Sequence, residues 1–311
     1  MNVLLVGEES AGIHALHRVA ESGHRIVGVA ASPTPKYGSP VTLWKAAQKL
    51  GCRTWAASIV KDPAFVQQIE EDGVDVLLNL HSLHIINEDV IRAAKVGSFN
   101  LHPGPLPRYA GLNPVCWALY SGEKTHGVTL HWMTSDIDAG PIAYQCVFPI
   151  TEEDTGFTVS VRCIKEGLQL VSRLLETLES NPASLPRVPQ DLAQRQYHGR
   201  EIPHGGRIIW SLPARQIVRF VRACDFYPFR SPWGHPRTIR DKLEIQIVKA
   251  THTGVRTDAP PGTASYSDAC GLVIACGDEW ISVSKVKLGD KFLNATEVLR
   301  VSDRLETDQW T

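Results

Sequence analysis

The chain has 311 residues, of which 43% are hydrophobic and 21% are charged, a composition typical of soluble globular proteins. Its 32 Lys and Arg residues nearly balance its 33 Asp and Glu residues, and the formal net charge of −1 argues against a dedicated nucleic-acid binder. No apolar run reaches the ~18 residues of a membrane span, and the N-terminus lacks the basic segment of a signal peptide. We therefore expect a cytoplasmic protein without a membrane partner.

The seven cysteines are scattered and include no Cys-x-x-Cys pair. This pattern favours a reducing compartment and argues against a disulfide framework or a structural zinc site. A zinc site made of His81, His84 and His102 is a minor alternative, since it has no cysteine partner. We predict no bound metal.

The first part of the chain alternates short apolar runs with helical patterns. The patterns predict strands at 3–6, 26–31, 74–80 and 98–101 and helices at 10–21, 43–50 and 66–71. Continuous apolar strands that alternate with helices predict an α/β fold with a Rossmann-like, doubly wound, mostly parallel sheet. Glu9 stands where a dinucleotide fingerprint requires a glycine, so we reject NAD binding.

The second part predicts a helix at 114–120, strands at 128–133 and 142–150, and a long helix at 155–178. A proline-rich, polar stretch at 181–203 is typical of a semi-rigid linker. After it come a helix at 213–223 and strands at 243–248, 271–275 and 280–286. We expect a domain of residues 1–180, a linker of 181–203, and a smaller β-rich, barrel-like C-terminal domain of 204–311.

The segment 99–111 holds the most informative residues. Asn100 and His102 alternate on a short strand, so their side chains face the same side. Three prolines and two glycines follow within nine residues and predict a rigid loop at the carboxyl end of the strand, where this fold class binds ligands. A second loop, at 134–141, offers Asp136 and Asp138 just before a Gly-Pro turn. Asp136 suits an ordinary turn residue, and Asp138 is better placed for chemistry.

The Asn-x-His motif, the Pro-Leu-Pro loop and the Asp-Ala-Gly-Pro turn together resemble the folate-dependent formyltransferases. The resemblance extends from residue 1 to about 179, and the segments 205–210, 261–263 and 271–277 are similar to the C-terminal domain of the methionyl-tRNA formyltransferase branch. It implies the formyltransferase fold, a formyl-transferring enzyme, and 10-formyltetrahydrofolate as the formyl donor.

The resemblance also implies the site residues. Asn100 would stabilise the oxyanion, and His102 and Asp138 would move protons, in a division that the sequence leaves open. The folate would lie against two loops, largely against their backbone. The corresponding residues here are Leu80, His81, Leu83, His84, Ile85, Trp132, Thr134 and Asp136.

The acceptor is expected to be a small-molecule amine, either an amino sugar or an amino-acid, siderophore or nonribosomal-peptide precursor, free or linked to a nucleotide or carrier protein. The tRNA-directed branch has a long basic insertion after the second strand, but the stretch 32–40 is short here. Residues 201–311 hold 15 Lys and Arg against 13 Asp and Glu, a weak field for a polyanion. Arg108 and Tyr109 either contact the acceptor or cap their loop.

The alternatives are a methionyl-tRNA formyltransferase, a hydrolase of 10-formyltetrahydrofolate, and a non-catalytic folate-binding module. A homodimer is compatible with the sequence.

Overall fold

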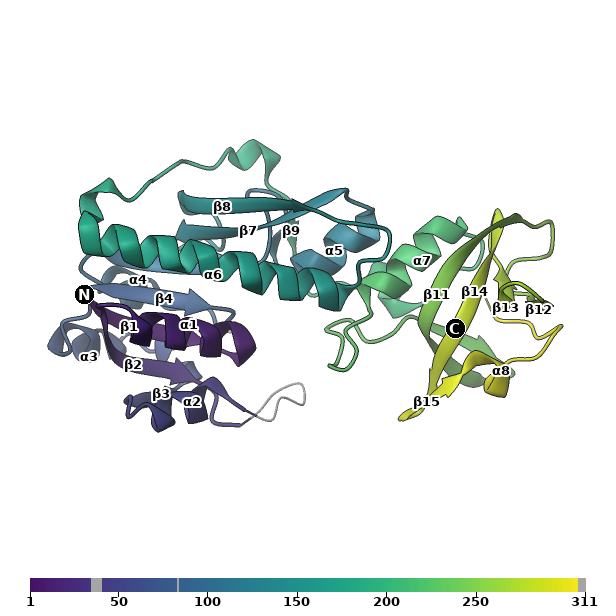
Figure 1. Cartoon of the computed structure of the whole chain (residues 1–311), viewed down its shortest axis with the longest axis horizontal. Coiled ribbons are helices and arrows are strands. Elements are labelled where there is room, and N and C mark those ends of the chain that lie inside the picture. Colours follow the sequence, from purple (N-terminus) through teal and green to yellow (C-terminus); the bar gives the residue numbers. More distant parts are fainter. Residues whose placement is uncertain (35–40, 83, 307–311) are drawn as a thin grey trace. The chain divides into compact units, whose positions relative to one another are not determined.

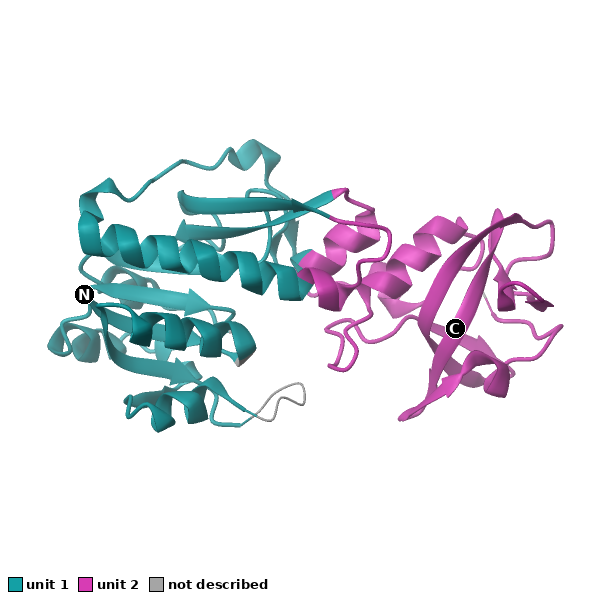
Figure 2. Ribbon diagram, in the orientation of Figure 1, with its two compact units in different colours: residues 1–114, 125–149, 160–198 teal, residues 115–124, 150–159, 199–311 magenta. Residues whose placement is uncertain are grey.

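The computed structural model describes residues 1–34, 41–82 and 84–306, and the chain divides into two compact units (Figures 1 and 2). Unit 1 holds residues 1–114, 125–149 and 160–198, and unit 2 holds 115–124, 150–159 and 199–311. Most of the stretch expected to be a linker therefore belongs to unit 1, and domain limits at 180 and 203 stay a prediction. Among the described residues, no helix is long and apolar enough to cross a membrane.

Unit 1 is built on a seven-stranded sheet in the order β3-β2-β1-β4-β5-β7-β8. The strands are β1 (Asn2–Gly7), β2 (Arg25–Ala31), β3 (Thr54–Ala56), β4 (Val76–Leu80), β5 (Gly97–His102), β7 (Thr125–Trp132) and β8 (Ile142–Pro149). The strands from β3 to β5 pair in parallel, and β7 and β8 are antiparallel to their neighbours. The predicted doubly wound, mostly parallel sheet is confirmed.

Helices cover both faces of this sheet because alternate side chains of a strand point to opposite faces. Val3 and Leu5 of β1 join one buried cluster, and Leu4 and Val6 join the other. The first cluster is covered by α1, α2 and α6, and the second by α3 and α4. These helices are α1 (Glu9–Glu21), α2 (Leu43–Lys49), α3 (Phe65–Glu71), α4 (Glu88–Arg92) and α6 (Gly156–Ser180), the last of which begins in unit 2.

Unit 2 contains a six-stranded antiparallel sheet in the order β10-β11-β14-β13-β12, with β15 on β14. The strands are β10 (Arg237–Arg240), β11 (Leu243–Arg256), β12 (Ala264–Ser267), β13 (Gly271–Ala275), β14 (Glu279–Leu288) and β15 (Lys291–Asn294). The helices are α5 (Pro114–Ser121, in unit 2 from its second residue), α7 (Ala214–Ala223) and α8 (Ala295–Val298). The apolar side of α7 packs on the sheet around the fully buried Trp210.

The C-terminal segment bridges the two edge strands of this sheet. Next to β12, Leu305 N donates to Gly262 O at 2.9 Å, and next to β10, Glu306 N donates to Ile239 O at 2.8 Å. Pairing both edges with one segment removes exposed strand edges and gives the sheet a barrel-like closure. The barrel-like character expected of this domain therefore depends on residues close to its end.

Replacing Gly262 with alanine tests this closure. Gly262 has φ +83°, and a Cβ there would lie 2.3 Å from Leu305 O. We expect Gly262→Ala to lower the free energy of unfolding by about 1–3 kcal/mol, measured by urea denaturation. Gly254→Ala is the matched control, because Gly254 has φ +70° but open space around it. Equal losses in the two variants would mean that the contact with Leu305 contributes nothing.

Candidate active site

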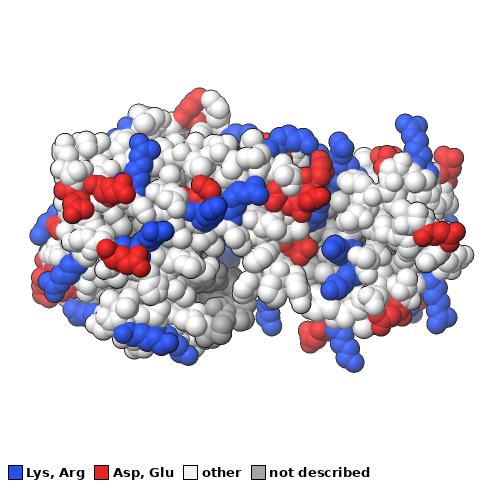
Figure 3. Space-filling view, viewed as in Figure 1, with Lys and Arg blue, Asp and Glu red and all other residues white. Residues whose placement is uncertain are grey.

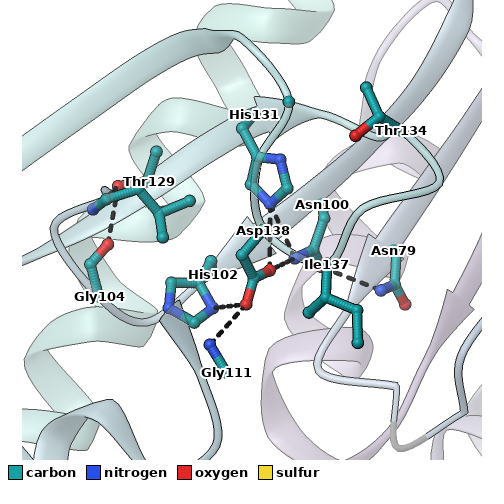
Figure 4. Close-up of polar contacts among 12 residues, drawn as sticks. Asn79, Asn100, His102, Gly104, Gly111, Thr129, His131, Thr134, Ile137 and Asp138 are labelled. Atoms are coloured by element: carbon teal, nitrogen blue, oxygen red, sulfur yellow. Dashed lines mark hydrogen bonds and ion pairs between the residues drawn. The ribbon is translucent and has the colours of Figure 1, made fainter. Parts of the chain in front are cut away.

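A row of polar side chains crosses three neighbouring strands of the buried sheet in unit 1. Asn79 of β4, Asn100 of β5 and His131 of β7 are paired in register. Asn79 Nδ2 donates to Asn100 Oδ1 at 2.9 Å, and Asn100 Nδ2 lies 3.1 Å from His131 Nε2 (Figure 4). The row lies near the carboxyl ends of β4 and β5, where this fold class binds ligands.

His102 follows Asn100 by two residues and is buried, with 4% of its surface exposed. Its Nε2 lies 2.8 Å from Tyr109 O, and because a carbonyl can only accept, Nε2 carries the proton of the neutral ring. Its Nδ1 faces Asp138 Oδ2 at 3.5 Å. The ring therefore takes up a further proton at Nδ1, beside the carboxylate.

Asp138 is buried among donors. Gly111 N donates to its Oδ2 at 2.8 Å, and Asn100 Nδ2 donates to its Oδ1 at 3.2 Å. His131 Nε2 lies 3.4 Å from the same Oδ1. The structure thus brings the three residues singled out in the sequence, Asn100, His102 and Asp138, into one bonded cluster (Figure 4).

The loop that follows His102 is fixed by a threonine of β7. Thr129 Oγ1 donates to Gly104 O at 2.7 Å and accepts from Leu106 N at 3.2 Å. Gln145 Nε2 donates to the same hydroxyl oxygen at 2.8 Å. These bonds hold the proline-rich loop against the sheet, as its composition predicts.

Side chains of the stretch expected to be a linker donate hydrogen bonds to the backbone of the loop that carries Asp138. Gln190 Nε2 donates to Asp138 O at 2.9 Å and to Gly140 O at 2.7 Å. Arg195 Nη2 donates to Ile137 O at 2.9 Å. Asp138 itself has a left-handed backbone, with φ 53°, so these bonds support a conformation that costs free energy.

The same stretch also pairs with the loop after β5. β6 (Ala110–Gly111) runs parallel to β9 (Tyr197–His198), and a Cβ on Gly111 would lie 2.2 Å from His198 O. Tyr109 is only 3% exposed and stacks on the ring of His198 at 5.7 Å. Of the two roles considered for Tyr109, packing of the loop is the one that its burial supports. The guanidinium of Arg108 lies over the Tyr109 ring at 5.2 Å.

Electrostatics keep Asp138 ionised and His102 neutral. Burial alone would raise the pKa of Asp138, but His102, His131 and the Gly111 amide lower it, and the result is a pKa well below the ordinary value. Burial lowers the pKa of His102, and Asp138 partly offsets this effect. Burial, together with repulsion by the protonated form of His102, lowers the pKa of His81 to about 4.

The first loop expected to hold the folate follows β4. Leu80 is buried in the core, so it offers a ligand only backbone groups. His81 and His84 are partly buried, and Ile85 is 70% exposed. Leu83 lies outside the described residues.

The second expected folate loop follows β7. Trp132 packs on Phe99 at 4.3 Å, so its ring belongs to the core. Thr134 and Asp136 are exposed, and Thr134 Oγ1 donates to Asp136 O at 3.2 Å. Thr134 and Ile137 lie on the loop that passes Asn100 (Figure 4). A ligand bound here would meet exposed loop groups and one exposed apolar side chain.

Three residues of the site lie outside the motifs that the sequence offers. Asn79 interrupts an otherwise apolar strand, which is a sequence signal for a polar role. His131 interrupts the predicted strand 128–133 in the same way. Gln190 lies in a polar stretch, where nothing distinguishes it. In the part of the chain that the structure describes, no three His, Cys, Asp or Glu side chains form a group suited to a metal ion, so the zinc alternative gains no support.

Comparison with known proteins identifies both parts of the chain. Residues 31–175 match the model of the formyl transferase family, and residues 202–302 match that of the formyl transferase C-terminal domain. An N-formyltransferase from Helicobacter canadensis, in complex with folinic acid and dTDP-3-aminofucose, shares 18% identity over 90% of this chain and 98% of its own, with a TM-score of 0.66. WlaRD, a sugar 3N-formyl transferase in the presence of dTDP and 5-N-formyl-THF, shares 19% identity over 91% and 97%, with a TM-score of 0.66.

HypX from Aquifex aeolicus, in complex with tetrahydrofolic acid, shares 17% identity over 96% of this chain and 46% of its own, with a TM-score of 0.60. At these identities the similarity to solved structures shows a shared fold. The two family models together span most of the sequence in the order that the resemblance predicts. The chain therefore belongs to the formyl transferase family, as its motifs indicate.

Proposed function

We propose that the protein transfers the formyl group of 10-formyltetrahydrofolate to the amine of a small molecule, with a nucleotide-linked amino sugar as the first candidate. The observation that carries the proposal is the bonded cluster of Asn100, His102 and Asp138 in a chain that has both formyl transferase domains. The donor supplies the formyl carbon. The residues must polarise its oxygen and remove a proton from the amine.

Asn100 can donate to the formyl oxygen while it holds the cluster together. His131 Nδ1 lies 2.8 Å from Trp132 O, so the neutral ring donates from Nδ1 and accepts at Nε2. Asn100 Nδ2, His131 Nε2 and Asp138 Oδ1 form a triangle with sides of 3.1, 3.2 and 3.4 Å. The angle at Nδ2 between the directions to the two acceptors is only about half of the angle between the two N–H bonds of an amide. One N–H can serve both acceptors, which leaves the other for substrate.

His102 is better suited than Asp138 to accept the proton of the amine. Asp138 is a weak base because its pKa is far below neutrality, whereas His102 is neutral and has a lone pair at Nδ1. As the amine bonds to the formyl carbon, its proton passes to Nδ1, and Asp138 stabilises the imidazolium. The bond between the formyl carbon and the folate nitrogen breaks, and the His102 imidazolium returns the proton to that nitrogen.

Support for an amino-sugar acceptor comes from two observations. Two sugar N-formyltransferases share the fold over nearly their whole length. In addition, Lys and Arg side chains are interspersed with Asp and Glu side chains on the face shown in Figure 3. Residues 201–311 hold 15 Lys and Arg against 13 Asp and Glu, a weak field for a polyanion such as tRNA.

The rate of formyl transfer tests the roles of Asn100 and His102. We expect Asn100→Ala and His102→Ala each to lower kcat by about 100-fold or more, the usual scale for an oxyanion donor or a proton-transfer residue. The measurement is the release of tetrahydrofolate in the presence of an amine acceptor. His17→Ala, at an exposed position of α1, is the control and should match the wild type. A variant of Asn100 or His102 with a near wild-type rate would refute its catalytic role.

Titration of His102 tests the electrostatics. Burial disfavours the imidazolium, so we expect the His102 ring signals to titrate with a pKa below 6.5 in NMR spectra. Asp138→Asn removes the charge that favours the imidazolium and should lower this pKa further. The same depression means that protonation below pH 6.5 favours the unfolded chain, so stability should fall as the pH falls through this range. A midpoint at or above 6.5 would contradict the neutral ring.

Comparison of acceptors tests the substrate class. With 10-formyltetrahydrofolate as donor, we expect formylation of at least one nucleotide-linked amino sugar and none of charged initiator methionyl-tRNA. Mass spectrometry of the sugar nucleotide and gel analysis of the tRNA report the two products. Efficient formylation of the tRNA would overturn the small-molecule proposal. Release of tetrahydrofolate with no amine present would indicate hydrolysis instead.

A further inference from the structure

The central strand β4 carries a polar side chain that stability does not explain. All five residues of β4 are buried, and the other four are apolar. Asn79 is 7% exposed, and its Nδ2 donates to Asn100 Oδ1 at 2.9 Å. Its own Oδ1 is buried with no hydrogen-bond partner among the described residues. A buried carbonyl without a partner destabilises a fold, and among the described residues only the bond to Asn100 offsets that cost.

What the chain gains at this position is control over the Asn100 amide. While Asn79 donates to Oδ1 of Asn100, Nδ2 of Asn100 must point the other way, toward Asp138 and His131. In the flipped orientation, the Asn100 oxygen would face the Asp138 carboxylate and its NH₂ group would face another donor. With Asn79 oriented as in the structure, its Nδ2 toward Asn100, the amide is held from both sides.

The two sides differ in how they behave during proton transfer. Asp138 and His131 have ionisable side chains, so their preference for an N–H donor weakens whenever one of them gains a proton. A side-chain amide does not titrate near neutral pH. In the orientation that the structure shows, the bond from Asn79 to Asn100 therefore does not change its charge as protons move in the cluster.

We propose that Asn79 is a positioning residue that keeps the N–H of Asn100 aimed at the substrate oxygen throughout the reaction. The inference rests on the proposed function of Asn100 and adds a residue outside the three that the sequence motifs indicate. Asn79 acts through Asn100 and needs no contact with substrate.

Two substitutions separate positioning from packing. Asn79→Leu removes the donor and leaves an apolar side chain of similar size, and we expect kcat to fall by about 10- to 100-fold. The KM values should stay within about twofold, because the residue does not touch substrate. Asn79→Asp places an ionised acceptor against Asn100 Oδ1, which favours the flipped amide, so kcat should fall further at pH 8.

The pH dependence of Asn79→Asp gives the sharper test. Burial raises the pKa of a carboxyl group, and once protonated, Asp at position 79 can again donate to Asn100 Oδ1. We therefore expect the ratio of its kcat to that of the wild type to rise by about tenfold or more between pH 8 and pH 6. The ratio of the kcat of Asn79→Leu to that of the wild type should stay constant. Dividing by the wild-type kcat cancels the titration of the groups on the surrounding elements, because both proteins share them. These groups are Glu8, His81, His102, His131 and Asp138.

Leu77→Ala is the matched structural control. Leu77 is fully buried on the same face of β4, two residues before Asn79, and belongs to the apolar core. It should lower stability yet keep the wild-type kcat and pH profile at a temperature where it is folded. A kcat of Asn79→Leu within twofold of the wild type, or a pH-independent ratio for Asn79→Asp, would overturn the proposal.

A second readout separates this inference from the proposed function. The side-chain amide signals of Asn100, assigned by their loss in Asn100→Ala, should shift in Asn79→Asp at pH 8 and return toward their wild-type positions at pH 6. An inactive wild type would overturn the proposed function, but these signals would still decide the orientation. Signals that do not move would refute the role of Asn79.

Discussion

The site depends on the burial of one charge, the carboxylate of Asp138. A buried carboxylate is tolerated only when polar groups replace its water, and Asp138 accepts hydrogen bonds from the Gly111 amide and from Asn100, with the rings of His102 and His131 beside it. These groups come from β5, β7 and the loop after β5, so placing the charge draws those elements together. In the proposed mechanism, the low pKa of Asp138 leaves proton transfer to His102. The two carboxylate oxygens of Asp138 therefore both hold these elements together and set the electrostatics of the site.

The carboxylate is useful only if its loop is held, and the proline-rich stretch of unit 1 provides that support. Trp132 Nε1 donates to Pro186 O at 2.8 Å, and Val188 exchanges backbone bonds with Ile142. Gln190 then binds the Asp138 loop, and β9 binds the loop after β5. A stiff chain with few conformations of its own loses less entropy when it is fixed in such a position. The composition of this stretch is typical of a linker, but here the stretch binds both site loops and holds them in place.

A structural feature can be predicted from the sequence when a short run of neighbouring residues marks it. Asn100 and His102 stand out because two polar residues alternate on one strand before a rigid loop, and Asp138 because a Gly-Pro turn follows it. Apolar runs locate β1 and β4, and helical patterns of apolar residues locate most helices. The three-residue β3 and the two-residue β6 and β9 are too short for any periodicity. Asn79 and His131 each stand out as a polar residue in an apolar strand, but their pairing with Asn100 depends on the register of the sheet, which the sequence does not show.

Recognition of the acceptor must come from outside this cluster. Asn100, His102, His131 and Asp138 are bonded to one another and to backbone groups, and the proposed chemistry uses the one N–H and the one lone pair that remain. Such a cluster can act on any amine brought within reach, because it contacts only the atoms that react. The residues free to vary with the acceptor are those that belong neither to the bonded cluster nor to the two expected folate loops. This separation explains how one set of motifs can predict formyl transfer while the identity of the amine has to be found from the surrounding surface.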